Sequence, residues 1–260
     1  MKKHSCALFC LTTLLSIACI SWKIDFTKVP KSTSKTNTTA NLLFERYIED
    51  IYQTAHLNES NLDFTIFKKG VTGFFNLKNQ KNLSNSASVL TIVNFNLPSN
   101  KKRMWIIDLV AKNLVLNTWV SHGQGSGKAK ATRFSDKVES HASSLGFYLT
   151  DDVYDGKNGR SLRLDGLDPG FNTHARDRAI VIHGAEYVNP NIGNEGYLGR
   201  SFGCLAVSSD LLDQVINTLK QKTVIFVAGK SKKYKSKYLN ENLAANYVAQ
   251  NEELISLANL

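Results

Sequence analysis

The sequence predicts a mainly β domain with flanking helices, on three observations. Short apolar runs follow one another between Val89 and Ala228, and most contain the β-branched residues that strands favour. Gly- and Asp-rich connections separate several of these runs, as turns do. Apolar residues recur at helical spacing before Val89 and after Lys237, so helices are expected on both sides of the β region.

Residues 1–18 have the pattern of a secretory signal peptide. Lys2 and Lys3 form a basic start, an uncharged run follows over 6–20, and small residues stand at Ser16 and Ala18, the positions that a signal peptidase reads. The prediction is therefore an exported protein, located in the periplasm or cell envelope.

Two alternatives to cleavage would leave the protein associated with a membrane. One is an uncleaved anchor, although the uncharged run is shorter than the roughly 20 residues that a spanning helix needs. The other is lipidation of Cys19, although Ser16 stands where a lipoprotein signal usually has Leu, Val or Ile.

Two segments are expected before the β region. Residues 19–40 are rich in Lys, Ser and Thr and predict a flexible linker. Residues 41–88 predict a helical lead-in, with one helix over 41–57 capped by Asn41 and a second short helix and turn over 64–76.

Residues 89–229 form the predicted main domain. Its hairpin has Lys112 and Asn113 at the turn, and Ser208 or Ser209 caps a helix over 210–220. The expected strands are 89–95, 103–109, 114–120, 145–149, 161–164, 179–182 and 223–228. Residues 230–260 are expected to form a basic spacer and a helical tail.

The formal net charge is +10. A basic exported protein should be attracted to the carboxylates and phosphates of a bacterial envelope, although charge that serves only solubility fits equally well. Nucleic acid is disfavoured as a partner, because of the export signal and because no basic stripe interleaved with aromatic residues is present.

Cys204 is the only cysteine beyond residue 19. Exported proteins tend to pair their cysteines, so an unpaired thiol indicates chemistry rather than a disulfide. His183 follows an apolar run and could take the thiol proton, because only the thiolate attacks well. Gly203 would permit close approach of substrate, and amides at or near Cys204 could bind an oxyanion. The alternative is a buried structural cysteine.

These residues resemble the signature of the L,D-transpeptidase family, whose catalytic domain is often called YkuD-like. His183-Gly184 and Ser201-Phe202-Gly203-Cys204 fit the family's spacing, with Phe202 in place of the second histidine. The closer resemblance is to a divergent branch, the murein L,D-transpeptidase catalytic-domain proteins with a Gly-Arg-Ser-x-Gly-Cys motif. Further stretches resemble this branch in order: 121–127, 144–150, 161–167 and 175–185.

The resemblance implies a β-sandwich-like catalytic domain over residues 89–229. It implies Cys204 as nucleophile, His183 as base, the Gly203 and Cys204 amides as oxyanion donors, and Ser201 as a support for the site. The implied reaction begins when the thiol attacks the carbonyl before a terminal D-residue in the stem peptide of peptidoglycan. The acyl group then passes to an amine acceptor.

Four further residues are candidates for substrate contact: Arg200, Gly184, His122 and His141. Arg200 stands four residues from the thiol, and a guanidinium binds carboxylates in a bidentate fork. Either histidine could line the cleft or only cap a turn. No cofactor is expected, and no metal, because one thiol and scattered histidines form no ligand pattern.

Two other functions stay open. One is an L,D-carboxypeptidase or another cysteine hydrolase of wall peptides, which differs only in using water as acceptor. The other is a non-catalytic wall-binding protein that keeps the fold. Phe202 and Ala206, which depart from the main family signature, leave this second alternative open.

Overall fold

The computed structural model describes residues 33–189, 191 and 196–251. The predicted signal peptide and Cys19 lie outside these residues. Eight strands form one sheet in the order β3-β2-β1-β8-β4-β5-β6-β7, which confirms the prediction of a mainly β fold with flanking helices. The strands are β1 (Val89–Asn94), β2 (Met104–Asp108), β3 (Asn113–Thr118), β4 (Gly146–Gly156), β5 (Gly159–Gly166), β6 (Val181–Gly184), β7 (Leu205–Val207) and β8 (Val224–Ala228).

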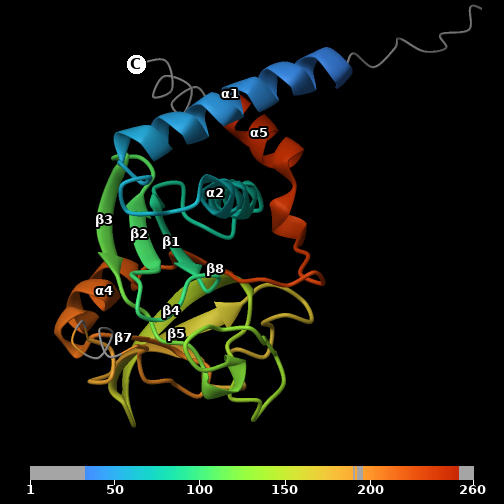
Figure 1. Cartoon of the computed structure of the whole chain (residues 1–260). Helices are drawn as coiled ribbons and strands as arrows, with labels where there is room; N and C mark the ends of the chain where they lie inside the picture. The colour runs from blue at the N-terminus through green and yellow to red at the C-terminus, as the bar shows by residue number, and fades with distance from the viewer. Residues whose placement is uncertain (1–32, 190, 192–195, 252–260) are drawn as a thin grey trace, which may run out of the picture.

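Three helices cover one face of the sheet at the top of Figure 1: α1 (Thr33–Thr54), α2 (Phe64–Asn79) and α5 (Glu241–Ala249). Asp63 caps α2 by accepting a hydrogen bond from the Ile66 N–H at 3.0 Å. α4 (Leu212–Leu219) packs on the opposite face and follows a short 3-10 turn, η2 (Ser209–Leu211). Two further 3-10 turns are η1 (Gln124–Ser126) and η3 (Lys237–Leu239).

Several elements differ from the sequence-based expectation. The helix expected over 210–220 is a 3-10 turn followed by α4, and no side chain makes a capping hydrogen bond at the start of either one. α1 begins at Thr33, so residues 33–40 of the predicted linker are helical and Asn41 lies inside the helix; extending an existing helix is far easier than starting one. β4 runs on to Gly156 through Asp151 and Asp152. A register shift between Thr150 and Val153 accommodates one extra residue of β4 relative to β5. β7 was not expected, since three residues are too few to show strand periodicity.

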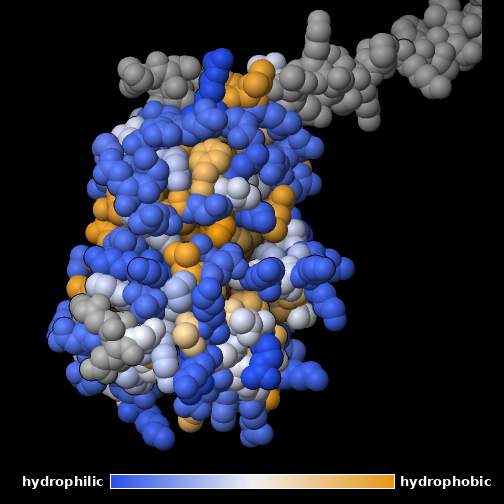
Figure 2. Space-filling view, in the orientation of Figure 1, coloured by the Kyte–Doolittle hydropathy of each residue, from blue (hydrophilic) through white to orange (hydrophobic). Residues whose placement is uncertain are grey.

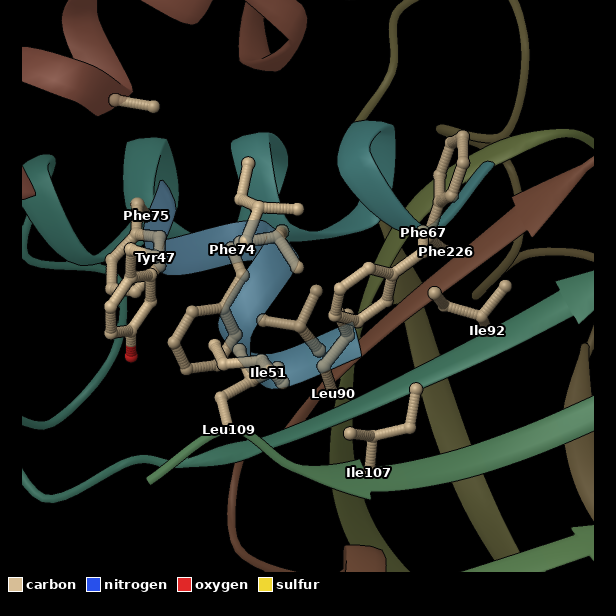
Figure 3. Packing of buried hydrophobic residues seen from close by; sticks show 14 of the residues in the cluster. Tyr47, Ile51, Phe67, Phe74, Phe75, Leu90, Ile92, Ile107, Leu109 and Phe226 are labelled. Atoms are coloured by element: carbon tan, nitrogen blue, oxygen red, sulfur yellow. The ribbon is translucent and has the colours of Figure 1, made fainter. Parts of the chain in front are cut away.

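The helices and the sheet share a first hydrophobic core, the helix-side core. Side chains from α1 and α2 point down onto β1, β2 and β8, as Figure 3 shows. Its central residues are Tyr47, Ile51, Phe67, Phe74, Phe75, Leu90, Ile92, Ile107, Leu109 and Phe226. The lead-in helices are therefore part of the packed molecule.

Gly73 sets how closely α2 approaches the sheet. A Cβ at Gly73 would overlap the ring of Phe147, which itself stacks on Phe226 at 4.5 Å between centroids. Gly73→Ala should therefore destabilise the fold, because overpacking costs about 1–3 kcal/mol and exceeds the roughly 1 kcal/mol that alanine adds to helix propensity.

Urea unfolding of Gly73→Ala beside Gly70→Ala tests this account of α2. A Cβ at Gly70 would first meet the flexible end of Ile92, at 3.0 Å, so this matched variant should lose much less stability. Equal losses in the two variants would contradict the role given to Gly73.

A second hydrophobic core, the inner core, shows that the sheet curls. Residues of β1 and β2 pack with residues of β5, β6 and β7, although these strands lie in opposite halves of the sheet order. The inner core includes Val93, Phe95, Met104, Ile106, Leu162, Leu164, Ile182, Leu205, Val207, Ile225 and Val227. This curl produces the β-sandwich-like arrangement that was predicted.

The curl brings the two edges of the sheet together at a seam, formed by residues 119–124 after β3 and residues 199–206 around the start of β7. The Ser121 N–H donates to the Ala206 carbonyl at 2.8 Å, and the Ser201 N–H donates to the His122 carbonyl at 3.1 Å. The Gln124 N–H donates back to the Ser201 carbonyl at 2.8 Å. Cys204 therefore lies in the seam.

The segment after β8 is anchored to the sheet. The Tyr234 hydroxyl donates to the buried Asp168 carboxylate at 2.8 Å, and the Ser236 hydroxyl does so at 2.6 Å. The predicted spacer therefore makes specific contacts, while the division into lead-in, main domain and tail stays a prediction. None of the helices within the described ranges is long and apolar enough to cross a membrane. Hydrophilic residues cover most of the face in Figure 2.

Candidate active site

A cavity of about 360 Å³ opens at the seam. It brings together four residues predicted from the sequence: Cys204, His183, Ser201 and Arg200. Its other lining residues in the described part of the chain are Gln124, Asn158, Arg178, Ala179, Tyr187 and Phe202. Four of the predicted site residues, Gly203, Gly184, His122 and His141, are not among the lining residues.

The loop before Cys204 is held by Ser201. The Ser201 hydroxyl accepts a hydrogen bond from the Gly203 N–H at 3.1 Å and donates to the Cys204 carbonyl at 2.8 Å. Gly203 has a φ of +120°, and a Cβ there would lie 2.9 Å from the Ala142 carbonyl oxygen, so glycine is required. The Gly203 N–H is thus engaged by Ser201 in this conformation, which leaves the Cys204 N–H as the candidate oxyanion donor.

The Cys204 thiol is half-buried and donates to the Ala179 carbonyl oxygen at 3.5 Å. Burial raises the pKa of the thiol, and this effect outweighs the opposing effects of the Val181 N–H, the Arg178 charge and the Cys204 N–H. The thiol is therefore protonated at neutral pH in the free protein, so attack requires a base.

His183 is oriented by its own backbone. Its Nδ1 lies 2.9 Å from the Gly184 carbonyl oxygen, which assigns the proton to Nδ1 and leaves Nε2 as an acceptor. Burial lowers the pKa of the imidazole, so it is neutral at pH 7 and able to accept a proton. Gly184 thus contributes through its carbonyl group and does not line the cavity. In the parallel pairing of β6 with β7, His183 lies opposite Ala206, two residues from the thiol.

Two arginines make the cavity basic. The Arg178 guanidinium is held by the Ser135 carbonyl at 2.9 Å and the Ser144 hydroxyl at 2.7 Å. Arg200 donates from Nη1 to the Gly127 carbonyl at 3.1 Å. No acidic residue lines the cavity within the described ranges, and no group of three His, Cys, Asp or Glu that could hold a metal ion occurs there. The site therefore favours an anionic substrate.

Tyr187 was not predicted from the sequence. It lines the cavity, and burial, followed by the charge of an ionised Cys204, raises its pKa to about 12. A Cβ at Gly199 would lie 2.6 Å from the Tyr187 Cβ, so this glycine lets the ring lie against the loop. Tyr187 follows His183-Gly184 by only three residues, and this closeness to the predicted base is the sequence feature that could have indicated a place in the site.

His141 and Phe202 lie together at the mouth of the cavity. Their rings stack with centroids 4.3 Å apart and planes 18° apart. Phe202, which is 64% exposed, lines the cavity, so His141 reaches the site only through this contact. The phenylalanine that departs from the family signature thus forms an aromatic rim.

The prediction that His122 contacts substrate is wrong. Its ring is fully buried, and its Nδ1 lies 2.8 Å from Arg103 Nη2. Burial, and then the Arg103 charge, lower the pKa of His122 to about 4. A fully buried ring that is paired with an arginine through its Nδ1 does not line a cleft, so His122 has a structural place in the protein.

The low pKa of His122 predicts acid destabilisation. Between pH 6.5 and about 4 the unfolded chain binds a proton at His122 that the folded chain does not bind, so stability falls as pH falls. The loss by pH 4.5 should reach about 2 kcal/mol. Urea unfolding at pH 7 and 4.5 should show this loss in the wild type, and a smaller one in His122→Gln. The same pH dependence in both proteins would contradict the assignment.

A family model of the L,D-transpeptidase catalytic domain matches residues 58–228, which includes α2 and all eight strands. No curated protein matches the chain.

Solved structures of L,D-transpeptidases are also similar. The L,D-transpeptidase from Mycobacterium smegmatis is 13% identical, with a TM-score of 0.35 over 55% of this chain and 59% of that one. L,D-transpeptidase 1 of Mycobacterium tuberculosis is 10% identical, with a TM-score of 0.32 over 55% and 63%. The helical cell shape determining protein Pgp2 from Campylobacter jejuni is 15% identical, with a TM-score of 0.37 over 68% and 62%. The chain thus covers less than two thirds of each of these structures.

Proposed function

The chain belongs to the L,D-transpeptidase catalytic-domain family, and on this premise we propose that it is a cysteine-dependent acyltransferase acting on stem peptides of peptidoglycan. The observation that carries the proposal is the cavity at the seam, where a single thiol and an imidazole with an unprotonated Nε2 line the same space. Neither residue is engaged in a disulfide or a metal site in the described part of the chain.

The first half-reaction forms an acyl-enzyme. His183 Nε2 takes the proton from Cys204 as the sulfur attacks the carbonyl carbon before the terminal D-residue of the stem. The oxygen becomes an oxyanion, which the Cys204 N–H stabilises. When the C–N bond breaks, His183 returns its proton to the leaving amine. The products are a thioester on Cys204 and the free D-amino acid.

The second half-reaction reverses these roles. The amine of an acceptor stem attacks the thioester carbonyl and gives its proton to His183. The C–S bond breaks, the new amide leaves, and the sulfur recovers the proton from His183. A neutral thiol and a neutral imidazole are thus restored, which is the state that the burial of both groups favours.

Arg200 is proposed to bind a carboxylate of the donor stem. It lines the cavity, and its one described hydrogen bond uses Nη1. Arg178 is held at both Nη atoms by the loop over 135–144, so we assign it to fixing the Gly203–Cys204 turn and to stabilising the thiolate by its charge. The proposal places the reaction in the cell envelope, where the predicted signal peptide would export the protein.

Incubation of the full chain with purified disaccharide–tetrapeptide fragments, followed by mass analysis, tests the proposed function. We expect cross-linked fragments and released D-amino acid. Tripeptide and D-amino acid without cross-links would instead indicate a hydrolase with water as acceptor. Unchanged fragments, with a folded protein, would indicate the non-catalytic wall-binding alternative.

A further inference from the structure

A fully buried arginine lies beneath the seam. Arg103 precedes β2 and donates from Nε and Nη2 to the Val120 carbonyl at 3.0 and 2.8 Å. It also donates from Nη1 to the Leu97 carbonyl at 2.9 Å and from Nη2 to His122 Nδ1 at 2.8 Å. All of these partners are neutral. Burial lowers the pKa of the guanidinium to about 9. Burying a cation without a counter-ion costs free energy of folding, so we expect Arg103 to have a role that offsets this cost.

Arg103 holds the segment over 120–124, which forms one side of the seam. Arg103 contacts Val120 and His122, and the residues in this stretch contact the loop of the thiol. The Ser121 hydroxyl donates to the Gly199 carbonyl at 2.6 Å, and the Ser121 N–H donates to the Ala206 carbonyl at 2.8 Å. The His122 carbonyl accepts the Ser201 N–H at 3.1 Å.

These hydrogen bonds lie on both sides of the nucleophile. Ser201 stands three residues before Cys204, and Ala206 stands two residues after it. The segment 120–124 therefore contacts the chain on both sides of Cys204, and it is itself held by the guanidinium of Arg103. A shift of this stretch would move the thiol relative to the Ala179 carbonyl, the Val181 N–H and the Arg178 charge.

We propose that Arg103 and His122 are positioning residues, which hold the seam segment at 120–124 and through it the Cys204 loop in reactive geometry. The inference rests on the proposed function in one respect only, that Cys204 is the reacting group. Arginine suits this role because its planar fork reaches three acceptors in fixed directions, whereas lysine carries a single ammonium on a flexible stem.

The test compares two replacements of His122. His122→Gln keeps a side-chain oxygen that can accept the hydrogen bond from Arg103, whereas His122→Phe keeps a ring and removes the acceptor. Arg103→Lys is the third variant. Trp105→Phe is the matched control, because Trp105 is equally buried two residues further along, in β2, but belongs to the helix-side core and donates to Ser60.

The readout is the pH dependence of Cys204 alkylation by iodoacetamide in the full chain, followed by peptide mass analysis, well below the melting temperature of each variant. In His122→Phe and Arg103→Lys, alkylation at pH 7 should slow about tenfold, since small displacements of reacting groups have effects of this size. The profile should also move to higher pH, because the thiol loses contacts that lower its pKa. His122→Gln should stay close to wild type, and Trp105→Phe should melt earlier with an unchanged profile.

A wild-type profile in His122→Phe, with only a lower melting temperature, would overturn the proposal and leave the pair a purely structural role. If Arg103→Lys does not fold, the comparison of His122→Phe with His122→Gln decides alone. Alkylation needs no peptidoglycan, so failure of the proposed acyltransferase activity in the wild type would be seen separately and would leave the positioning result intact.

Discussion

Cys204→Ala is expected to reduce acyl transfer from stem peptides by about 10⁴–10⁶-fold, the range seen when a nucleophile is removed from an enzyme that works through a covalent intermediate. The fold should survive, because the thiol is half-buried and its one described hydrogen bond, to the Ala179 carbonyl at 3.5 Å, is long. Turnover of disaccharide–tetrapeptide fragments and the melting temperature are the two measurements.

Cys204→Ser is the matched control for this variant. The hydroxyl preserves the size and polarity of the side chain, but it is far less ionised than a thiol, so activity should stay close to that of the alanine variant. Activity near the wild-type level in a folded Cys204→Ala protein would mean that the reaction does not use this residue.

His183→Ala should slow acylation of Cys204 by about 10²–10⁴-fold at pH 7, the usual contribution of a general base. The sign of the pH effect follows from the two pKa shifts. Burial raises the pKa of the thiol, so without His183 the thiolate forms only at alkaline pH, and raising the pH should partly restore the rate. In the wild type, burial lowers the pKa of His183, so its acidic limb should lie below about pH 6.5.

His141→Ala is the control for the base. This residue reaches the cavity only through its stack on Phe202, so its removal should alter substrate affinity more than the rate of proton transfer. A larger loss and an alkaline rescue in His141→Ala, with His183→Ala near normal, would show that the wrong histidine has been assigned.

Local patterns predicted much of the fold. α2, β1, β8 and the hairpin of β2 and β3 lie where apolar periodicity and the Lys112 turn place them, because each is specified by residues close in sequence. β7 was not predicted because it depends on pairing with β6. The prediction for β4 ended too early because the register shift at Asp151 and Asp152 depends on the pairing with β5.

The candidate site was predictable only in part for the same reason. Cys204, Ser201 and His183 belong to motifs that local sequence carries, and they line one cavity. His122 stands in one of the stretches that resemble the family, yet its ring is fully buried and its Nδ1 is paired with Arg103, which lies 19 residues away in the sequence. The seam itself consists of backbone hydrogen bonds between 119–124 and 199–206. Such bonds do not depend on residue type, so the sequence pattern could not predict them.

The pKa shifts of Cys204 and His183 indicate that the thiol is not a preformed thiolate. A cysteine poised as a thiolate would react without help, whereas burial keeps both Cys204 and His183 neutral in the free protein. In the proposed reaction, the proton transfer between them is therefore part of the chemical step, and attack requires the thiol to leave its contact with the Ala179 carbonyl.

The most direct measurement is the mass of the protein trapped during turnover. The full chain is mixed with a tetrapeptide-bearing fragment, quenched in acid, and mapped by peptide mass spectrometry. The account predicts an adduct equal to the donor acyl group without its terminal D-residue, carried by Cys204 and released by hydroxylamine as a thioester is. Product formation with Cys204 unmodified, or with the adduct on another residue, would contradict it.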